Sequence, residues 1–231
     1  MRQVSVVVAA GGVGKRMGGG LPKQFLPLGG ITVLERAIRA FHSLPEVREI
    51  VLVVPAPYLA RARRIMRLSR LEKKTRVVAG GKERQESVYR GLEACRIRSG
   101  VVLVHDAARP LVERSLIREV IRAARKTGAA LAALEVKDTV KAEMPSRAGF
   151  TQKTMPREAL WAAQTPQGFS FDLLWKAHTR ARRSGYLGTD EASLIERMGH
   201  PVKIVRGSER NIKITTRADR EWAEFALNRR F

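Results

Sequence analysis

The sequence predicts an α/β protein in which a mostly parallel sheet is flanked by helices. Short apolar runs rich in β-branched residues alternate along the chain with segments of helical periodicity. The predicted strands are almost entirely apolar, as expected for strands that are covered on both faces. The chain of 231 residues is also long enough for one large α/β domain with a full hydrophobic core.

The apolar runs predict six strands. They cover Val4–Ala10, Glu49–Val54, Arg76–Ala79, Val101–His105, Ala129–Val136 and Val202–Val205. Helices are predicted between them from the periodicity. They cover Val33–Ser43, Pro57–Ser69, Arg84–Cys95, Glu113–Lys126, Phe171–Arg183 and, at the end of the chain, Arg217–Asn228. Right-handed crossovers bring the carboxyl ends of parallel strands to one edge of the sheet, where ligands bind in such folds.

Residues 137 to 168 break this alternation. Short alternating pieces surround a Pro-Ser-Arg-Ala-Gly turn, and a structureless loop of this length is unusual inside a compact domain. We therefore expect a β-hairpin that leaves the main domain. A β-arm over residues 137–158 needs something to pack on, and a second copy of the chain is the expected partner. The sequence shows no internal repeat or linker, so it predicts a single domain over residues 1–231 that includes the protruding β-arm.

The composition favours a cytoplasmic protein that binds anionic ligands. Forty-four Lys and Arg against 22 Asp and Glu give a net charge of +22, a balance that attracts nucleic acid, anionic membranes or phosphorylated small molecules. No apolar run reaches the ~20 residues that span a bilayer, and no secretion signal is recognisable. The basic segment 61–76 also carries an apolar stripe, which favours the solvated face of an amphipathic helix. Nucleic-acid binding thus rests on charge alone, and Cys95 is expected to be a packing residue.

The loop after the first strand is predicted to bind phosphates. It reads AAGGVGKRMGGGLPKQF over residues 9–25. It is not a Walker loop, because Arg16 follows Gly14-Lys15 where Ser or Thr is required. It is not a dinucleotide fingerprint either, because Met17 takes the place of the third glycine. Its glycines let the backbone approach a ligand closely, and its cations, Lys23 included, suit a polyphosphate.

Asp106 ends the fourth predicted strand. A carboxylate at this place contacts ribose hydroxyls or a phosphate-bound magnesium ion, or it caps the next turn, and the residue types leave these alternatives open. The four histidines follow no metal-ligand spacing, and the sequence has no G-x-S-x-G elbow or Cys-His signature. An enzyme with these residues works by positioning and charge stabilisation. Phosphoryl and nucleotidyl transfer are reactions that need little else.

Seven motifs resemble the 2-C-methyl-D-erythritol 4-phosphate cytidylyltransferase family of non-mevalonate isoprenoid synthesis. In chain order they are VVAAGGVGKRMGGGLPKQF, GGKERQESVYRGL, VLVHDAARP, VKDTVK, WAAQTPQGF, GYLGTDEASLIERMG and ERNIKITT. They span nearly the whole chain. The resemblance implies a Rossmann-like sheet, CTP as a substrate with Mg2+, and a homodimer that exchanges the β-arm. It also implies that a sugar-alcohol phosphate attacks the α-phosphorus of CTP in line and expels pyrophosphate, which gives 4-diphosphocytidyl-2-C-methyl-D-erythritol.

The resemblance also implies roles for single residues. Arg16 and Lys23 match the family's transition-state cations. Arg157 and Lys213 match the residues that position the attacking phosphate, with Thr139 near the same phosphate. The expected contacts to the nucleotide and its surroundings are Ala10, Gly11, Gly12, Gly14, Gly81, Ser87, Asp106, Ala107 and Arg109, of which Gly81 and Ser87 read the cytosine. No direct metal ligand is expected, except that Asp106 could lie beside the phosphate-bound magnesium.

Two positions depart from the family pattern. Gly11 stands where many members have Ala, which should be harmless, and Arg210 stands before Asn211 where an acid is usual, which bears on how Lys213 is held. A pentitol-phosphate cytidylyltransferase, such as the ribitol 5-phosphate enzyme, is the closest alternative because it shares the fold and differs in the acceptor pocket. A basic nucleic-acid-binding protein is the alternative from another class. We expect no specific nucleic acid and no membrane as partners.

Overall fold

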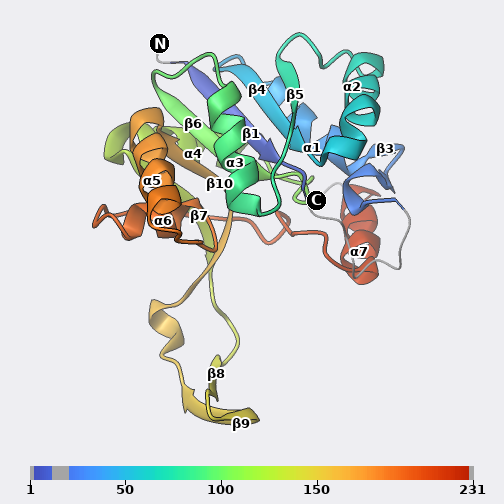
Figure 1. Ribbon diagram of the computed structural model, residues 1–231. Coiled ribbons are helices and arrows are strands. Elements are labelled where there is room, and N and C mark those ends of the chain that lie inside the picture. Colours follow the sequence, from blue (N-terminus) through green and yellow to red (C-terminus); the bar gives the residue numbers. More distant parts are fainter. Residues whose placement is uncertain (1–2, 12–20, 229–231) are drawn as a thin grey trace.

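A seven-stranded sheet forms the centre of the fold (Figure 1). The computed structural model describes residues 3–11 and 21–228, so the predicted ligand residues Gly12, Gly14 and Arg16 lie outside the described residues. The strand order is β11 (Lys203–Arg206), β7 (Ala129–Glu135), β10 (Trp161–Ser170), β6 (Val101–Asp106), β1 (Val4–Ala9), β4 (Val47–Val54) and β5 (Thr75–Ala79). All neighbouring strands are parallel except that β10 is antiparallel to both β6 and β7. The predicted α/β fold with a mostly parallel sheet is confirmed.

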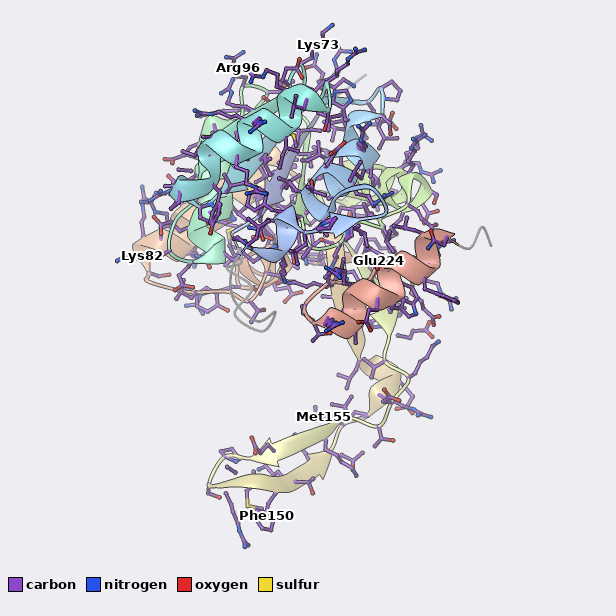
Figure 2. All side chains as sticks on the ribbon, turned by 90° about the vertical axis from the view of Figure 1, so that its right-hand side faces the viewer. Lys73, Lys82, Arg96, Phe150, Met155 and Glu224 are labelled. Carbon is purple, nitrogen blue, oxygen red and sulfur yellow. The ribbon has the colours of Figure 1, made fainter. Side chains whose placement is uncertain are left out.

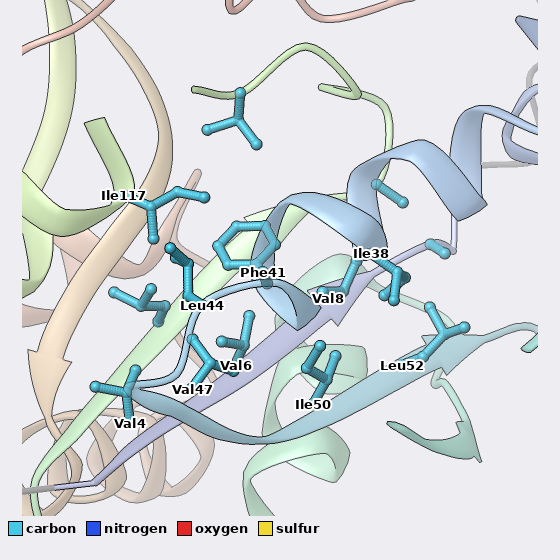
Figure 3. Packing of buried hydrophobic residues seen from close by; sticks show 14 of the residues in the cluster. Val4, Val6, Val8, Ile38, Phe41, Leu44, Val47, Ile50, Leu52 and Ile117 are labelled. Atoms are coloured by element: carbon cyan, nitrogen blue, oxygen red, sulfur yellow. The ribbon is translucent and has the colours of Figure 1, made fainter. Parts of the chain in front are cut away.

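Helices cover both faces of the sheet. One face carries α1 (Val33–His42), α2 (Leu59–Leu68) and α4 (Arg114–Thr127), and the other carries α3 (Arg84–Ala94), α5 (Phe171–Arg183) and α6 (Glu191–Glu196). Side chains alternate along β1, so that Val6 and Val8 pack beneath Phe41 of α1 (Figure 3) while Val7 packs on the opposite face. The strands are therefore buried on both faces, as their apolar sequences predict.

The strand β10 is a correction to the prediction that residues 137 to 168 leave the main domain as one hairpin. Residues 161–168 instead belong to the middle of the sheet, and Gln164, Thr165 and Gln167 are buried there. The pairing with β7 shifts register between Ala163 and Gln167, where Pro166 stands. Proline in a strand is found at such irregularities because it cannot donate to the ladder. The predicted strands and helices otherwise begin and end within two residues of the observed ones, and α6 is the helix that the periodicity missed.

The arm leaves the sheet between β7 and β10. It contains a hairpin of β8 (Lys141–Met144) and β9 (Arg147–Thr154), followed by a short 3₁₀ turn over Arg157–Ala159. The hairpin lies apart from the rest of the molecule in two perpendicular views (Figures 1 and 2). Every residue of β9 is exposed, and Phe150 has 48% of its surface accessible. The predicted hairpin is therefore present, and it does not pack on either face of the seven-stranded sheet (Figures 1 and 2).

A small hairpin and the last helix close one end of the molecule. β2 (Pro27–Leu28) pairs with β3 (Ile31–Thr32), and α7 (Arg217–Asn228) packs beside them. Their shared apolar cluster contains Leu28, Val33, Ile214 and Ala223. The first turn of α7 is capped reciprocally, since Thr216 Oγ1 accepts from the Asp219 N–H at 3.2 Å and Asp219 accepts from the Thr216 N–H at 2.7 Å. No helix in the described part of the chain is long and apolar enough to cross a membrane.

Candidate active site

Three predicted substrate loops meet at the carboxyl edge of the sheet. Ala9, the last residue of β1, pairs with Asp106 on one side and Val53 on the other, so these strands end level with one another. A Cβ atom placed on Gly11 would lie 3.7 Å from Ser87 Oγ, which brings the start of the first loop against the first turn of α3. That separation is an ordinary van der Waals contact, so the Ala found at this position in the family would fit. The carbonyl of Ala10 accepts from Gln24 Nε2 at 2.7 Å, which ties the two sides of the glycine loop together.

The loop predicted to read cytosine is held in place by its own helix. The Gly81 N–H donates to Ser87 Oγ at 3.1 Å, and the Lys82 N–H donates to Glu86 Oε2 at 2.9 Å. Glu86 in turn accepts from Arg90 at 2.6 Å. A Cβ on Gly81 would lie 2.1 Å from the Glu86 carboxyl carbon, so any side chain there would displace that carboxylate. The structure therefore brings Gly81 and Ser87 together, and a side chain at position 81 would require the partly exposed Glu86 carboxylate to move.

Asp106 lies at the centre of a cluster of alternating charges. One carboxylate oxygen is 3.0 Å from Arg84 Nε and the other is 2.7 Å from Lys213 Nζ. Arg84 also contacts Glu191 with both terminal nitrogens, at 2.9 Å each. Asp106 is 8% exposed and Glu191 is 1% exposed, so both carboxylates are buried and paired.

The charges in this cluster fix the protonation of Asp106. Burial opposes its ionisation, but Arg84 and Lys213 outweigh burial and hold the pKa of Asp106 well below its usual range. Burial also acts against the charge of Arg84, and Glu191 and Asp106 raise the pKa of Arg84 above its ordinary value. Asp106 is therefore an anion and Arg84 a cation at neutral pH. A carboxylate in this state can accept from a ribose hydroxyl or neutralise a cation but cannot act as a proton donor.

A hydrogen-bonded relay fixes the turn that follows Asp106. The Asp106 N–H donates to Thr165 Oγ1 at 3.0 Å, and Thr165 Oγ1 lies 3.1 Å from His105 Nδ1. His105 Nε2 lies 3.0 Å from the Arg109 carbonyl oxygen, which can only accept. Nε2 must therefore carry the proton, and the Thr165 hydroxyl donates to Nδ1. Burial lowers the pKa of His105 to about 4, which keeps the ring neutral.

The same turn places Ala107 and Arg109. Ala107 is 1% exposed and its N–H donates to the carbonyl of Ala9 at 2.9 Å, across to the strand that leads into the glycine loop. Arg109 donates to the Asn211 carbonyl at 2.6 Å. Asn211 is fully buried and donates through Nδ2 to the Thr165 carbonyl at 2.8 Å. Both predicted residues thus belong to the Asp106 cluster, and Arg109 connects it to the segment that carries Lys213.

Lys213 reaches Asp106 because its neighbours are anchored. Ile214 is fully buried and Ile212 packs on the same cluster, so the intervening Lys213 points away from it toward the sheet edge. The Ile214 N–H donates to the carbonyl of Ala108 at 2.8 Å. Arg210, the departure from the family pattern, donates instead to the carbonyl of Ala226 in α7 at 3.3 Å. This contact of Arg210 leaves Lys213 paired with Asp106.

Arg157 and Thr139 lie on the arm. Arg157 donates to the Lys137 carbonyl at 2.8 Å, and Lys137 forms an exposed ion pair with Glu209. Thr139 is exposed at the base of the arm. Within the described residues, the structure does not bring Arg157 into the hydrogen-bonded cluster around Asp106. The two cations predicted to position one phosphate, Arg157 and Lys213, are thus separated in a single chain.

The residue types around Asp106 bear on magnesium. In the described ranges, no group of three or more His, Cys, Asp or Glu side chains could hold a metal ion. Both oxygens of Asp106 contact cations, and both oxygens of Glu191 contact Arg84. Magnesium retains waters and phosphate oxygens when it binds with nucleotides. The cluster therefore fits an ion that is carried mainly by a triphosphate, with Asp106 as the nearby carboxylate.

Arg84, Glu191, His105 and Thr165 are site residues that the sequence reasoning missed. The partners are far apart in the chain: Arg84 and Glu191 are separated by 107 positions. Nothing in periodicity or local spacing connects them. The signal that was present for Arg84 and Glu191 is their place inside two of the quoted motifs, GGKERQESVYRGL and GYLGTDEASLIERMG, although no role was attached to these two residues.

The fold and this site define a nucleotidyltransferase of the Rossmann-like α/β type. A sequence model of the 2-C-methyl-D-erythritol 4-phosphate cytidylyltransferase family matches residues 4–229. Curated relatives with that name include the Geobacillus kaustophilus protein, 44% identical over 96% of this chain and 95% of its own. The Pelotomaculum thermopropionicum protein is 46% identical over 100% of this chain and 96% of its own.

Solved structures agree with the sequence matches. The 4-diphosphocytidyl-2C-methyl-D-erythritol synthase from Anaerococcus prevotii has a TM-score of 0.86 and 31% identity, covering 99% of this chain and 97% of its own. The cytidylyltransferase from Thermus thermophilus has a TM-score of 0.79 and 36% identity, covering 98% and 100%. The chain belongs to the 2-C-methyl-D-erythritol 4-phosphate cytidylyltransferase family. The activity predicted from the sequence, transfer of CMP from CTP to 2-C-methyl-D-erythritol 4-phosphate, is supported by this membership over the full chain.

Proposed function

We propose that CMP transfer takes place at the carboxyl edge of the sheet, between the glycine loop and the Asp106 cluster. The observation that carries the proposal is the position of Lys213, held 2.7 Å from Asp106, which pairs with Ala9 at the start of the glycine loop. A phosphate monoester has its second pKa near 6, so the acceptor is largely ionised at neutral pH. The reaction needs no general base, and the site need only bring two polyanions together.

The predicted cations divide this task. Arg16 and Lys23 belong to the loop expected to hold the CTP triphosphate, where negative charge grows as pyrophosphate leaves. Lys213 grips the acceptor phosphate and orients it for in-line attack on the α-phosphorus. Ala107, Arg109 and the Gly81–Ser87 loop complete the nucleotide surroundings. Asp106 would lie beside a magnesium ion carried by the CTP phosphates, and that ion would neutralise part of their charge.

The arm supplies Arg157 to a second copy of the chain. In this proposal the enzyme is a homodimer, and Arg157 and Thr139 from one protomer face the acceptor phosphate in its partner. The support is the full exposure of β9 and the separation of Arg157 from the Asp106 cluster within one chain. We place this enzyme, a single nucleotidyltransferase domain with its arm, in the cytoplasm, where CTP and sugar phosphates are available.

A pyrophosphate-release assay tests the proposed function. The acceptors are 2-C-methyl-D-erythritol 4-phosphate and ribitol 5-phosphate, each tested with CTP, ATP and GTP in the presence of magnesium. We expect release with CTP and the methylerythritol phosphate, because a purine is too large for the pocket that the Gly81 loop closes. Equal use of ATP would contradict the cytosine-reading role of that loop. Preference for ribitol 5-phosphate would contradict the acceptor assignment and leave the nucleotide assignment in place.

A further inference from the structure

Arg84 and Glu191 connect the active-site edge to a part of the chain with no assigned role. We propose that they are positioning residues, which hold the Asp106 carboxylate in the orientation from which it meets the substrates. The inference rests on the substrate-binding role proposed for Asp106. It assigns a function to the segment around Glu191, the first residue of α6.

The geometry uses all three nitrogens of one guanidinium. Nε contacts Asp106 at 3.0 Å, and the two terminal nitrogens contact the two oxygens of Glu191 at 2.9 Å each. A planar fork with this arrangement fixes direction as well as charge, which a lysine ammonium cannot do. Glu191, Arg84, Asp106 and Lys213 thus form a row of alternating charges in which each neighbour restrains the next.

Glu191 is itself held from both sides. Asp190 caps α6 by accepting from the Ser193 N–H at 2.9 Å, and its other oxygen accepts from Gln167 of β10 at 2.7 Å. Gln167 also accepts from the Ala192 N–H at 3.0 Å. Because the residues flanking Glu191 are tied to β10, an interior strand of the sheet, its carboxylate is held in a fixed position.

The second tie comes from the residue next to Arg84. Gln85 donates to the Tyr186 carbonyl at 3.0 Å and accepts from the Gly188 N–H at 2.8 Å. The first turn of α3 and the segment before Glu191 are therefore joined by two adjacent side chains, Arg84 and Gln85. Movement of either segment would be transmitted to Asp106 through Arg84.

This support matters when substrate binds. Lys213 contacts Asp106 in the structure, yet it is the residue proposed to grip the acceptor phosphate. As Lys213 turns to the phosphate, Asp106 loses one of its two cations. Arg84, restrained by Glu191, then keeps the other carboxylate oxygen in place. Without Glu191, only the Asp106 carboxylate would orient the Arg84 guanidinium. The guanidinium would then turn together with that carboxylate and could not hold it in place.

Steady-state kinetics on Glu191→Gln, Arg84→Lys and Asp106→Asn test the proposal. Loss of partners that orient a ligating group typically costs about 10- to 100-fold in activity. We expect Glu191→Gln to lower kcat/KM by roughly that factor, and Arg84→Lys to lower it similarly despite the conserved charge. In the Asp106→Asn background, Glu191→Gln should change kcat/KM by less than about twofold, because residues acting through one group are not additive.

A matched control and a paired variant separate positioning from stability. Glu49 accepts from Ser5 Oγ at 2.8 Å and the Ile97 N–H at 2.7 Å at the opposite edge of the sheet. Glu49→Gln removes the same charge there, and we expect a lower unfolding temperature with kcat/KM within about twofold of the wild type. The double variant Arg84→Gln with Glu191→Gln removes both charges of this ion pair, so neither is left buried without its counter-charge. It should fold and show the kinetics of Arg84→Gln alone.

The results separate the positioning role of Arg84 and Glu191 from the substrate-binding role of Asp106. If Asp106→Asn shows wild-type kinetics, the proposed role of Asp106 is wrong and the positioning role falls with it. If Asp106→Asn is impaired while Glu191→Gln and Arg84→Lys are not, the positioning inference alone is overturned. Wild-type kinetics of Arg84→Lys would also overturn it, because a lysine would then serve as well as the planar guanidinium. A loss from Glu191→Gln that adds to the loss from Asp106→Asn would do the same, because Glu191 would then not act through Asp106.

Discussion

The two cations predicted to position one phosphate lie in very different surroundings. Lys213 belongs to a cluster in which Asp106 is 8% exposed and Glu191 is 1% exposed, and every carboxylate oxygen there contacts a cation. Arg157 lies on the arm and donates to the Lys137 carbonyl. Lys137 itself forms an exposed ion pair with Glu209. One region is complete within a single chain. The other is an exposed extension whose predicted role depends on what it meets.

This difference separates two ways of building a phosphate site. In the Asp106 cluster, the orienting contacts are made before any substrate binds, so little side-chain freedom remains to be lost on binding. On the arm, freezing a long cationic side chain requires contacts from elsewhere, and its full conformational entropy is lost at that moment. Substitutions in the first region should therefore act through misplacement of neighbours, and substitutions in the second through loss of the arm's own contact.

The largest expected effect distinguishes Lys23 of the glycine loop from the two cations predicted to hold the acceptor phosphate. Lys23→Ala should lower kcat by about a hundredfold or more, because it removes charge stabilisation that develops in the transition state. Arg157→Ala and Lys213→Ala should mainly raise KM for the acceptor and leave KM for CTP nearly unchanged, with some loss of kcat from misalignment. The measurement is pyrophosphate release with each substrate varied in turn. Weaker CTP binding in Lys213→Ala at an unchanged acceptor KM would show that the two subsites are assigned wrongly.

Mixing variants tests whether the two regions come from different protomers. Arg157→Ala and Lys213→Ala chains should each show little activity alone when the acceptor is held well below their raised KM. If the arm serves the neighbouring protomer, a mixed dimer has one intact site, and an equal mixture should regain about one quarter of the wild-type sites. Exchange of subunits is verified with differently tagged chains. A mixture that exchanges and stays inactive would show that Arg157 acts within its own chain or not at all.

The sheet and much of its carboxyl edge could be predicted because their signals are local. Apolar strands and helical periodicity depend on neighbouring residues, so the strand predicted over Val101–His105 ends within one residue of β6. β10 was not recognised as a strand of the sheet, because residues 137–168 as a whole were interpreted as a hairpin that leaves the main domain. Gln167 is tolerated in the core only because Asp190 and the Ala192 N–H satisfy its amide.

The Asp106 cluster shows the same limit on prediction. Asp106 and Lys213 were identified through motifs, but the ion pair between them joins positions 107 apart in sequence from different elements. Arg84 was passed over because a lone arginine at a helix start has no local pattern that distinguishes it from a surface cation. A charged residue meets a partner that is distant in the sequence only in the folded chain. Ion pairs of this kind therefore leave no periodicity or fixed spacing in the sequence from which they could be predicted.

Acid should distinguish the body of the protein from the arm. Burial lowers the pKa of His105 and of His178 to about 4, while the unfolded chain takes up these protons near pH 6.5. As the pH falls from about 6.5 to 4, the unfolded state binds protons that the folded state does not, so the free energy of unfolding decreases, by at most about 3 kcal/mol for each histidine. The arm, residues 137–158, contains no histidine.

His178→Leu should weaken this pH dependence. Neither ring nitrogen of His178 has a hydrogen-bond partner among the described residues, so a leucine leaves no described group unpaired. We expect urea unfolding at pH 7, 5.5 and 4.5 to show a smaller loss of free energy in the variant than in the wild type. An identical slope in the two proteins would mean that His178 is protonated in the folded state at these pH values.

The smallest expected effect comes from a Glu→Gln substitution at the base of the arm, the same change as Glu191→Gln in the Asp106 cluster. Glu209 pairs with Lys137 at the base of the arm, with 66% of its side-chain surface and 78% of the lysine's exposed. Exposed ion pairs contribute little, because water screens them and two long side chains must be ordered. Glu209→Gln should therefore shift the unfolding temperature by less than about 2 °C and leave the acceptor KM close to the wild-type value. Glu191→Gln removes an identical charge from the buried cluster and is expected to cost far more activity. If Glu209→Gln proved as damaging as Glu191→Gln, the exposed pair would have to orient Arg157 through the Lys137 backbone, and the arm would be pre-organised within its own chain.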